Sequence, residues 1–367
     1  MIPVTKTYLP PTDEFVNQIR KIWLNGWLTN NGQLSRELAE RLKGYLGIPN
    51  LELVANGTLA LQIAIKALGL RGEIITTPYS YVATTNSILW EGCEPVFVDI
   101  EDQTFCINPE LIEAAISRKT SAILATHVYG YPCDVLRVQQ IADKYKIKVI
   151  YDAAHAFGVR LSGESVLLHG NCSILSFHAT KLFHTAEGGA VISKDAEVAK
   201  CVFLMKKFGH MGEEDYLNIG INAKISELHA AMGLCVLPKV NDLIALRKEC
   251  SRWYNEQLDG CHLQRPVSPA GLEYNYAYYP VIFPSHEIMM RVRHALLDNA
   301  IGPRRYFCPS LNTLPFLKPE LKRPCPISES ISSRVLCLPM FAGLSETEVD
   351  FICGIVRDNL QGGPTLK

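Results

Sequence analysis

Three short segments of the sequence place reactive side chains directly after apolar runs. Lys181 follows CSILSF among apolar and small residues, Asp152 ends KVIYD, and Asn56-Gly57-Thr58 follows LELVA. An amine in apolar surroundings has a lowered pKa and can act as a nucleophile. A carboxylate can bind a metal, act as a base or pair with a protonated ring nitrogen. Glycine at a helix start lets an anion approach the free backbone N–H groups.

Each segment also has an ordinary structural interpretation, as a solvated lysine, a strand-end aspartate or a helix cap. Together, however, an anion site, a carboxylate and an amine are the groups that hold pyridoxal phosphate. Lys181 would form a Schiff base and move a proton, Asp152 would keep the pyridinium nitrogen protonated, and Asn56-Gly57-Thr58 would bind the phosphate. Tyr79 or Tyr81, in TTPYSYVATTN, would stack on the ring.

Alternating strand-like and helix-like segments would position these residues. From about residue 50, short β-branched runs alternate with amphipathic helical patterns. This pattern predicts an α/β fold whose mostly parallel central sheet is flanked by helices and binds ligands beyond the carboxyl ends of its strands. After residue 260 a strand over 276–283 and helices over 287–299 and 345–360 indicate an α+β region. We therefore predict a large domain over 1–255 and a small C-terminal domain over 256–367.

Composition and charge exclude several function classes. The chain has 36 Lys+Arg against 37 Asp+Glu and no basic block, which argues against nucleic-acid and membrane partners. No run approaches the ~18 consecutive apolar residues of a membrane span, and the N-terminus does not read as a signal peptide. The twelve cysteines include no Cys-x-x-Cys or Cys/His ligand pair, so no metal site is predicted. These features predict a cytoplasmic enzyme.

The motifs, taken in order, resemble those of one family. The segments NGT (56–58), YDAAHA (151–156), SFHATK (176–181) and EGG (187–189) resemble the DegT/DnrJ/EryC1/StrS sugar-nucleotide aminotransferases. HVYGYPCD, GINAKISELHAAMGL and PRRYFCPS extend the resemblance over essentially the whole chain. It implies a fold type I, aspartate-aminotransferase-like pyridoxal-phosphate enzyme. It also implies a homodimer with each active site at the subunit interface.

The resemblance assigns roles by motif position, with Lys181 as the Schiff-base lysine and Asp152 as the partner of the pyridinium nitrogen. The other cofactor-binding residues it implies are Gly57, Thr58 and Ser176 at the phosphate, Tyr81 on the ring, His155 near the 3-oxygen, and Asn222 from the neighbouring subunit. The implied substrate-binding residues are Trp27, Thr29 and Asn30 in the N-terminal segment of the large domain, with Arg305 and Tyr306. Some relatives carry histidine in place of the lysine and act as dehydratases, so Lys181 favours transamination.

The implied reaction begins with L-glutamate, which leaves pyridoxamine phosphate, and ends with amination of a nucleotide-linked keto sugar. Relatives acting at C3 often carry His-Tyr-Pro where this chain has Arg305-Tyr306-Phe307. The Arg-Arg-Tyr-Phe pattern instead resembles viosamine-type enzymes, which convert dTDP-4-keto-6-deoxyglucose to dTDP-4-amino-4,6-dideoxyglucose. C3 amination and a UDP-linked 4-keto sugar are the alternatives, and a dehydratase or a non-catalytic scaffold is a remoter one. We expect Arg305 to bind the diphosphate; the alternative is a surface arginine.

Overall fold

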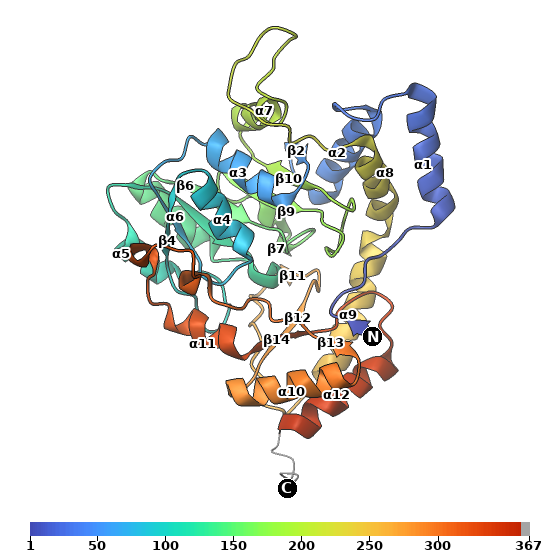
Figure 1. Cartoon of the computed structure of the whole chain (residues 1–367), viewed down its shortest axis with the longest axis vertical. Helices are drawn as coiled ribbons and strands as arrows, with labels where there is room; N and C mark the ends of the chain where they lie inside the picture. The colour runs from blue at the N-terminus through green and yellow to red at the C-terminus, as the bar shows by residue number, and fades with distance from the viewer. Residues whose placement is uncertain (361–367) are drawn as a thin grey trace.

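The computed structural model describes residues 1–360, and within them a seven-stranded sheet forms the centre of the molecule (Figure 1). The strand order is β2-β10-β9-β6-β5-β3-β4. The strands are β2 (Leu51–Val54), β3 (Glu73–Thr76), β4 (Glu94–Phe97), β5 (Thr120–Thr126), β6 (Lys148–Asp152), β9 (Cys172–Ser176) and β10 (Gly189–Ile192). Only β10 runs antiparallel to its neighbours, and the other pairs are parallel. The predicted mostly parallel α/β sheet is confirmed.

Helices cover both faces of this sheet (Figure 1). On one face, buried residues of α3, α4 and α7 pack against apolar side chains of the strands. On the other face, α2 and α8 cover the β2–β10–β9 side and α6 covers the β6–β5–β3 side. Coverage of both faces explains why the strands read as continuous apolar runs. The helices are α2 (Gln33–Leu46), α3 (Gly57–Ala67), α4 (Val82–Trp90), α5 (Ile112–Ala115), α6 (Val135–Tyr145), α7 (Ala196–Met205) and α8 (Glu227–Val236).

The chain after α9 (Val240–Gln257) forms an α+β region with its own buried apolar cluster, at the foot of the molecule in Figure 1. Its elements are β12 (Tyr279–Ile282), α10 (His286–Asp298), β13 (Ile301–Gly302), α11 (Pro326–Arg334), β14 (Val335–Leu338) and α12 (Glu346–Leu360). Strands β12 and β14 pair antiparallel. The predicted domain boundary at 255/256 falls in the last turn of α9, and the division into two domains stays a prediction.

The N-terminal segment connects this C-terminal region to the central sheet. Strand β1 (Ile2–Pro3) pairs in parallel with β13. Farther along, the Thr7 hydroxyl donates to the Ala179 carbonyl at 2.9 Å, and the Tyr8 carbonyl lies 2.7 Å from the His184 ring. The chain then forms α1 (Thr12–Asn25), which lies beside α8. A small separate sheet consists of β7 (Arg160–Leu161), β8 (Glu164–Ser165) and β11 (Leu272–Glu273).

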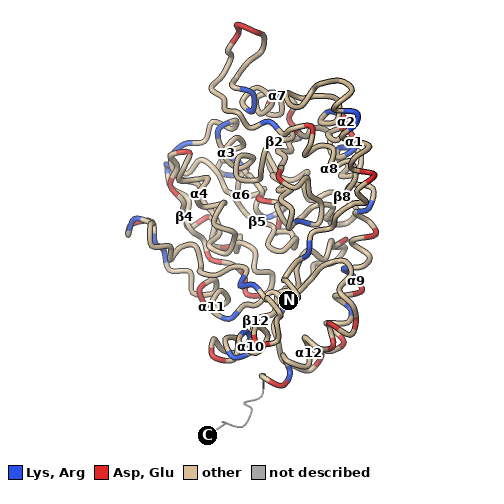
Figure 2. Tube along the Cα trace, turned by 45° about the vertical axis from the view of Figure 1, so that its right-hand side comes forward, with Lys and Arg blue, Asp and Glu red and all other residues tan. Residues whose placement is uncertain are grey.

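Charge and hydropathy are distributed as the composition suggests. Positively and negatively charged residues are interspersed over the molecule (Figure 2).

Within residues 1–360, the helical stretch Glu227–Gln257 alone has the length and hydropathy that a membrane span would need. Half of its apolar window is buried inside the protein, where α8 packs against α1 and α2. Burial in the core therefore explains the hydropathy of this stretch.

Candidate active site

Most of the side chains singled out in the sequence line one cavity at the carboxyl ends of β6 and β9. The cavity has a volume of about 300 Å³, within the usual range for small-ligand sites. We call it the Lys181 cavity. The predicted site residues that line it are Gly57, Thr58, Tyr81, Asp152, His155, Ser176, Lys181 and Tyr306. They come from five separate parts of the sequence, and the sheet brings them together.

The start of α3 forms one wall of the Lys181 cavity. Asn56 caps this helix, because its side-chain oxygen accepts a hydrogen bond from the backbone N–H of Leu59 at 2.8 Å. Gly57 lies directly against Ser176, and a Cβ on this glycine would come within 2.9 Å of the Ser176 Cβ. The absence of a side chain thus leaves the first N–H groups of the helix open beside a serine hydroxyl. This combination suits an anionic group such as a phosphate.

Asp152 lies at the end of β6 and is held in one orientation. Its Oδ2 accepts a hydrogen bond from the Thr84 hydroxyl at 2.7 Å, and its Oδ1 accepts one from the Ala154 N–H at 3.1 Å. Burial raises the pKa of the Asp152 carboxyl above its ordinary value, against the opposing effect of these hydrogen bonds. A buried carboxylate of this kind is stabilised by a cationic partner in the cavity.

Lys181 provides the amine of the cavity. Its Nζ lies 3.2 Å from the hydroxyl oxygen of Tyr278 and 5.9 Å from the centre of that ring. Burial lowers the pKa of the Lys181 ammonium, and the nearby Asp152 acts in the opposite direction. A lowered pKa increases the fraction of uncharged amine at neutral pH, which is the nucleophilic form.

Aromatic rings form the rest of the Lys181 cavity. His155 is buried and stacks on Phe307, with 5.5 Å between ring centres. Burial lowers the pKa of the His155 imidazole well below its ordinary value, so the ring is neutral. Tyr81 is 58% exposed and lines the cavity. Tyr79, the other tyrosine considered for stacking, is fully buried and pairs its hydroxyl with that of Tyr129 at 2.7 Å, outside the cavity lining.

Three residues at this site were not singled out from the sequence. Tyr278 contacts Lys181, Phe307 stacks on His155, and Thr84 holds Asp152. Tyr278 lies in the segment predicted as a strand over 276–283, to which no functional role was assigned. The TTPYSYVATTN segment that suggested stacking tyrosines also contains Thr84. The only signal in the sequence was the hydroxyl of Thr84, four residues after Ser80 in the same segment.

A larger cavity of about 870 Å³ adjoins the Lys181 cavity and shares Ser80, Tyr81, Thr180, Tyr306 and Phe307 with it. We call it the arginine groove, because Arg293, Arg304 and Arg305 line it. The guanidinium of Arg305 is already engaged, since its Nη2 donates to the carbonyls of Ser332 and Ser333 at 3.0 and 3.1 Å. These carbonyls belong to the last turn of α11, so Arg305 holds the groove wall to that helix.

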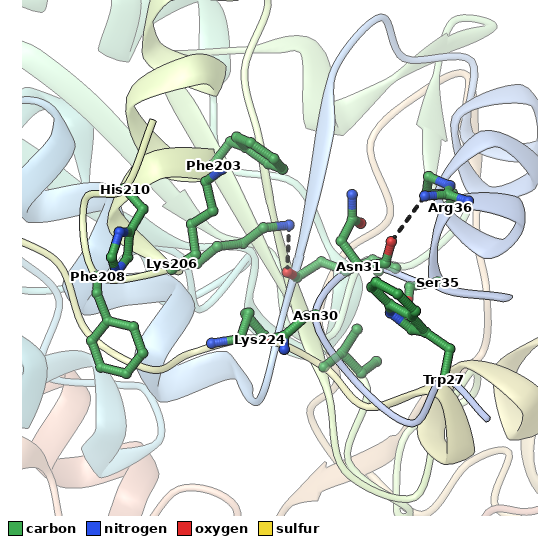
Figure 3. A pocket seen from close by; sticks show the side chains of 13 residues that line it. Trp27, Asn30, Asn31, Ser35, Arg36, Phe203, Lys206, Phe208, His210 and Lys224 are labelled. Carbon is green, nitrogen blue, oxygen red and sulfur yellow. Dashed lines mark hydrogen bonds between the residues drawn. The ribbon is translucent and has the colours of Figure 1, made fainter. Parts of the chain in front are cut away.

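A third cavity, of about 550 Å³, lies between the α1–α2 loop and the segment that follows α7 (Figure 3). Trp27 and Asn30 line it, whereas Thr29 is exposed outside its lining. The side chains of Lys206 and Lys224 also line this cavity. We call it the Trp27 cavity.

Asn222 lies on the exposed segment beside the Trp27 cavity and outside the lining of the Lys181 cavity of its own chain. Its side-chain oxygen accepts a hydrogen bond from Lys224 at 2.6 Å. The next residue, Ala223, accepts one from the Ala55 N–H at 2.8 Å. Within one chain, therefore, the structure does not bring Trp27, Thr29, Asn30 or Asn222 to the residues around Lys181.

Comparisons with known proteins agree on one family. The model of the DegT/DnrJ/EryC1/StrS aminotransferase family matches residues 11–357. A dTDP-4-amino-4,6-dideoxy-D-glucose transaminase of Shigella dysenteriae is 41% identical over 362 residues, which cover 97% of this chain and 98% of the relative. An Escherichia coli transaminase of the same name is 41% identical over 355 residues, covering 94% and 95%. The crystal structure of DesI with its TDP-sugar product has a TM-score of 0.93 at 29% identity, covering 98% of this chain and 93% of that one.

Proposed function

Because this chain belongs to the DegT/DnrJ/EryC1/StrS aminotransferase family, we propose that it transfers an amino group from L-glutamate to C4 of dTDP-4-keto-6-deoxyglucose. The product would be dTDP-4-amino-4,6-dideoxyglucose. The observation that carries this proposal is the 41% identity, over nearly the full length, to two transaminases named for that product. A UDP-N-acetyl-3-dehydro-α-D-glucosamine 3-aminotransferase of Acidithiobacillus ferrooxidans is only 29% identical, which favours C4 over C3.

The residues of the Lys181 cavity fit pyridoxal phosphate as the cofactor. Because Gly57 has no side chain, the N–H groups at the start of α3 are open beside Ser176, which leaves room for a phosphate. The buried carboxylate of Asp152 suits a protonated pyridinium nitrogen, and the Lys181 amine suits the cofactor's aldehyde. When bound, this cofactor supplies an electron sink that allows an amino group to move between an amino acid and a keto sugar.

Each residue of the chain then has a distinct task. Lys181 would attach the cofactor and carry a proton to and from the reacting carbon. Asp152, oriented by Thr84, would keep the ring nitrogen protonated. Gly57, Thr58 and Ser176 would hold the phosphate, and Tyr81 and His155 would contact the ring. Since burial keeps the His155 imidazole neutral, it can act as a hydrogen-bonding group without adding a charge.

We also propose that the enzyme is a homodimer whose partner completes each site. Asn222, Trp27 and Asn30 lie apart from the Lys181 cavity of their own chain, and all three are exposed. The loop after α7, which projects at the top of Figure 1, carries exposed apolar side chains. Those with the largest exposed fractions are Met211, Tyr216, Leu217 and Ile219. A second copy covering this loop would bury that surface and bring Asn222 to the partner's phosphate site.

The test is to incubate the purified enzyme with dTDP-4-keto-6-deoxyglucose and L-glutamate and to analyse the product by NMR. We expect an amino group at C4 and release of one 2-oxoglutarate per product. A UDP-linked 4-keto sugar serves as the comparison substrate for nucleotide choice. Amination at C3, or loss of water from the sugar without consumption of glutamate, would contradict the proposal.

A further inference from the structure

We infer that the arginine groove binds the diphosphate of the nucleotide sugar through Arg293 and Arg304, while Arg305 anchors the groove wall. This inference rests on the proposed function, because it supposes a nucleotide-linked substrate. It differs from the sequence-based expectation, which assigned the diphosphate to Arg305. That expectation remains a prediction, and the observations below favour its two neighbours in the groove.

The position of the groove suits the part of the substrate that does not react. The keto carbon must reach the Lys181 cavity, so the diphosphate and the base must extend away from it. The arginine groove begins where the Lys181 cavity ends, at Tyr81, Thr180 and Tyr306. With about 870 Å³, it is the larger of the two adjoining spaces. The remote part of a nucleotide sugar therefore has a continuous path into it.

The charge of the groove suits an anion. Its lining contains three arginines and no aspartate or glutamate. Arg304 is exposed and Arg293 is partly exposed. Within residues 1–360, neither guanidinium makes a side-chain hydrogen bond or an ion pair with another residue of the chain. Two uncompensated guanidinium groups facing one cavity match the two phosphates of a diphosphate, which guanidinium binds with paired hydrogen bonds.

The local backbone explains why Arg304 and Arg305 differ. Arg304 forms an antiparallel bridge with Cys337 of β14, with backbone hydrogen bonds of 3.2 and 2.7 Å in the two directions. In such an extended segment consecutive side chains point to opposite sides. Arg305 also lines the groove, but its guanidinium turns to the carbonyls at the end of α11, whereas Arg304 is exposed and its guanidinium stays unpaired within residues 1–360. The bridge to β14 fixes the backbone from which Arg304 projects.

The remaining lining residues suit the other parts of a nucleotide. Arg293 and Leu297 are four residues apart on α10, and both face the groove. Apolar side chains line the groove beside the arginines and would contact a base or a sugar ring. They are Val82, Leu297, Pro309, Leu311 and Leu314. A nucleotide would use both the arginines and this apolar surface, whereas a small dicarboxylate such as glutamate has no apolar part to fill it, so the groove favours the nucleotide.

The test measures binding of dTDP to the holoenzyme by isothermal titration calorimetry, with UDP and inorganic diphosphate as further probes. We expect Arg304→Gln and Arg293→Gln each to weaken dTDP binding by about tenfold or more, since each removes a charge-assisted contact. The affinity for inorganic diphosphate should fall in parallel. The matched control is Arg118→Gln, an exposed arginine before the amino end of β5, which should bind dTDP like the wild type.

Two further measurements separate the possible failures. Bleaching of the yellow holoenzyme by L-glutamate should be unchanged in Arg304→Gln and Arg293→Gln, and thermal melting should show that both variants fold. Arg304→Lys, which keeps the charge, should bind dTDP with intermediate affinity. Unchanged dTDP affinity in both glutamine variants, or a loss confined to glutamate, would overturn the inference. A wild-type enzyme that binds dTDP yet aminates no dTDP-keto sugar would refute the proposed function alone.

Discussion

The amine of Lys181 and the hydroxyl of Tyr278 lie within hydrogen-bonding distance, with 3.2 Å between Nζ and the hydroxyl oxygen. The two residues are 97 positions apart and come from the central sheet region and the C-terminal region. A lysine that attaches the cofactor must become a free amine each time it moves a proton. Tyr278 is the side chain placed to hold that amine in one position. From this pairing we predict that Tyr278 positions the amine of Lys181.

Tyr278→Phe should slow the reaction with glutamate more than it changes the KM for either substrate. Removing the hydroxyl leaves the freed Lys181 amine without its acceptor, so proton transfer becomes less efficient by about tenfold or more. Stopped-flow measurement of the bleaching rate checks this effect separately from the sugar half-reaction. Tyr276→Phe is the matched control, because Tyr276 contacts Tyr274 and does not line the Lys181 cavity. Equal rates in the two variants would remove Tyr278 from the mechanism.

Lys181→Ala should abolish turnover but still allow the cofactor to bind without a covalent bond. The proposed phosphate site at Gly57 and Ser176 and the Asp152 carboxylate are unaffected by this change, so they should retain affinity for the cofactor. Mass spectrometry after borohydride reduction should find the cofactor attached to the wild type but not to the variant. Lys200→Ala, an exposed lysine on α7, should behave like the wild type. Sustained turnover by Lys181→Ala would disprove the assignment.

Thr84→Val should move the acidic limb of the kcat profile to higher pH. The hydrogen bond from Thr84 lowers the pKa of the Asp152 carboxyl, against burial, which raises it. Without that bond the pKa rises further, so Asp152 becomes protonated at a higher pH and activity is lost sooner as the pH falls. The control is Thr85→Val, because the Thr85 hydroxyl is buried and has no hydrogen-bond partner within residues 1–360. A profile that does not move would show that Asp152 does not set this limb.

Gly57→Ala should weaken cofactor binding without unfolding the protein. The added Cβ would lie 2.9 Å from the Ser176 Cβ and would narrow the opening at the start of α3. Titration of the cofactor-free protein with pyridoxal phosphate, followed by its visible absorbance, measures the loss. Gly44→Ala, near the C-terminal end of α2 with no atom near the new Cβ, should instead raise stability by up to about 1 kcal/mol. Wild-type affinity in Gly57→Ala would contradict a phosphate site there.

Arg305→Ala should lower stability and also raise the KM for the nucleotide sugar. Loss of the two hydrogen bonds to Ser332 and Ser333 frees the segment that carries Arg304, at a cost of about 1–3 kcal/mol. Urea denaturation measures the first effect and steady-state kinetics the second. A higher KM for the nucleotide sugar without a loss of stability would instead indicate that Arg305 contacts the diphosphate directly. Equal increases in the KM values for the sugar and for glutamate would show that the effect of Arg305 is not specific to the nucleotide sugar.

The sequence predicted those site residues that lie at or just after the carboxyl end of a strand. The apolar runs before Asp152 and Ser176 indicate parallel strands, and parallel strands bring their carboxyl ends to one edge of the sheet. The antiparallel direction of β10 could not be predicted, because the sequence of a short apolar strand does not indicate in which direction it runs. Residue type alone left the choice between Tyr79 and Tyr81 open. The resemblance assigned Tyr81, and the structure buries Tyr79 with its hydroxyl against that of Tyr129.

Contacts between the C-terminal region and the sheet could not be predicted. Tyr278 reaches Lys181, and Phe307 reaches His155, only because the C-terminal region packs against the carboxyl ends of the strands. Arg305 pairs with carbonyls 27 and 28 residues away, a contact that local sequence does not indicate. The sequence indicated that Arg305 would bind an anion. It did not indicate that Arg304 forms a backbone bridge with Cys337, which fixes the backbone from which the two arginines project.

The path of the first residues joins the C-terminal region to the segment around Lys181. At one end β1 pairs with β13, next to α10 and the arginine groove. At the other end Thr7 and Tyr8 contact Ala179 and His184, on either side of Lys181. The first eight residues therefore tie the strand beside α10 to the backbone on either side of Lys181. Because an aminotransferase meets its two substrates in turn, this tether joins the groove proposed for the nucleotide to the cavity proposed for the chemistry.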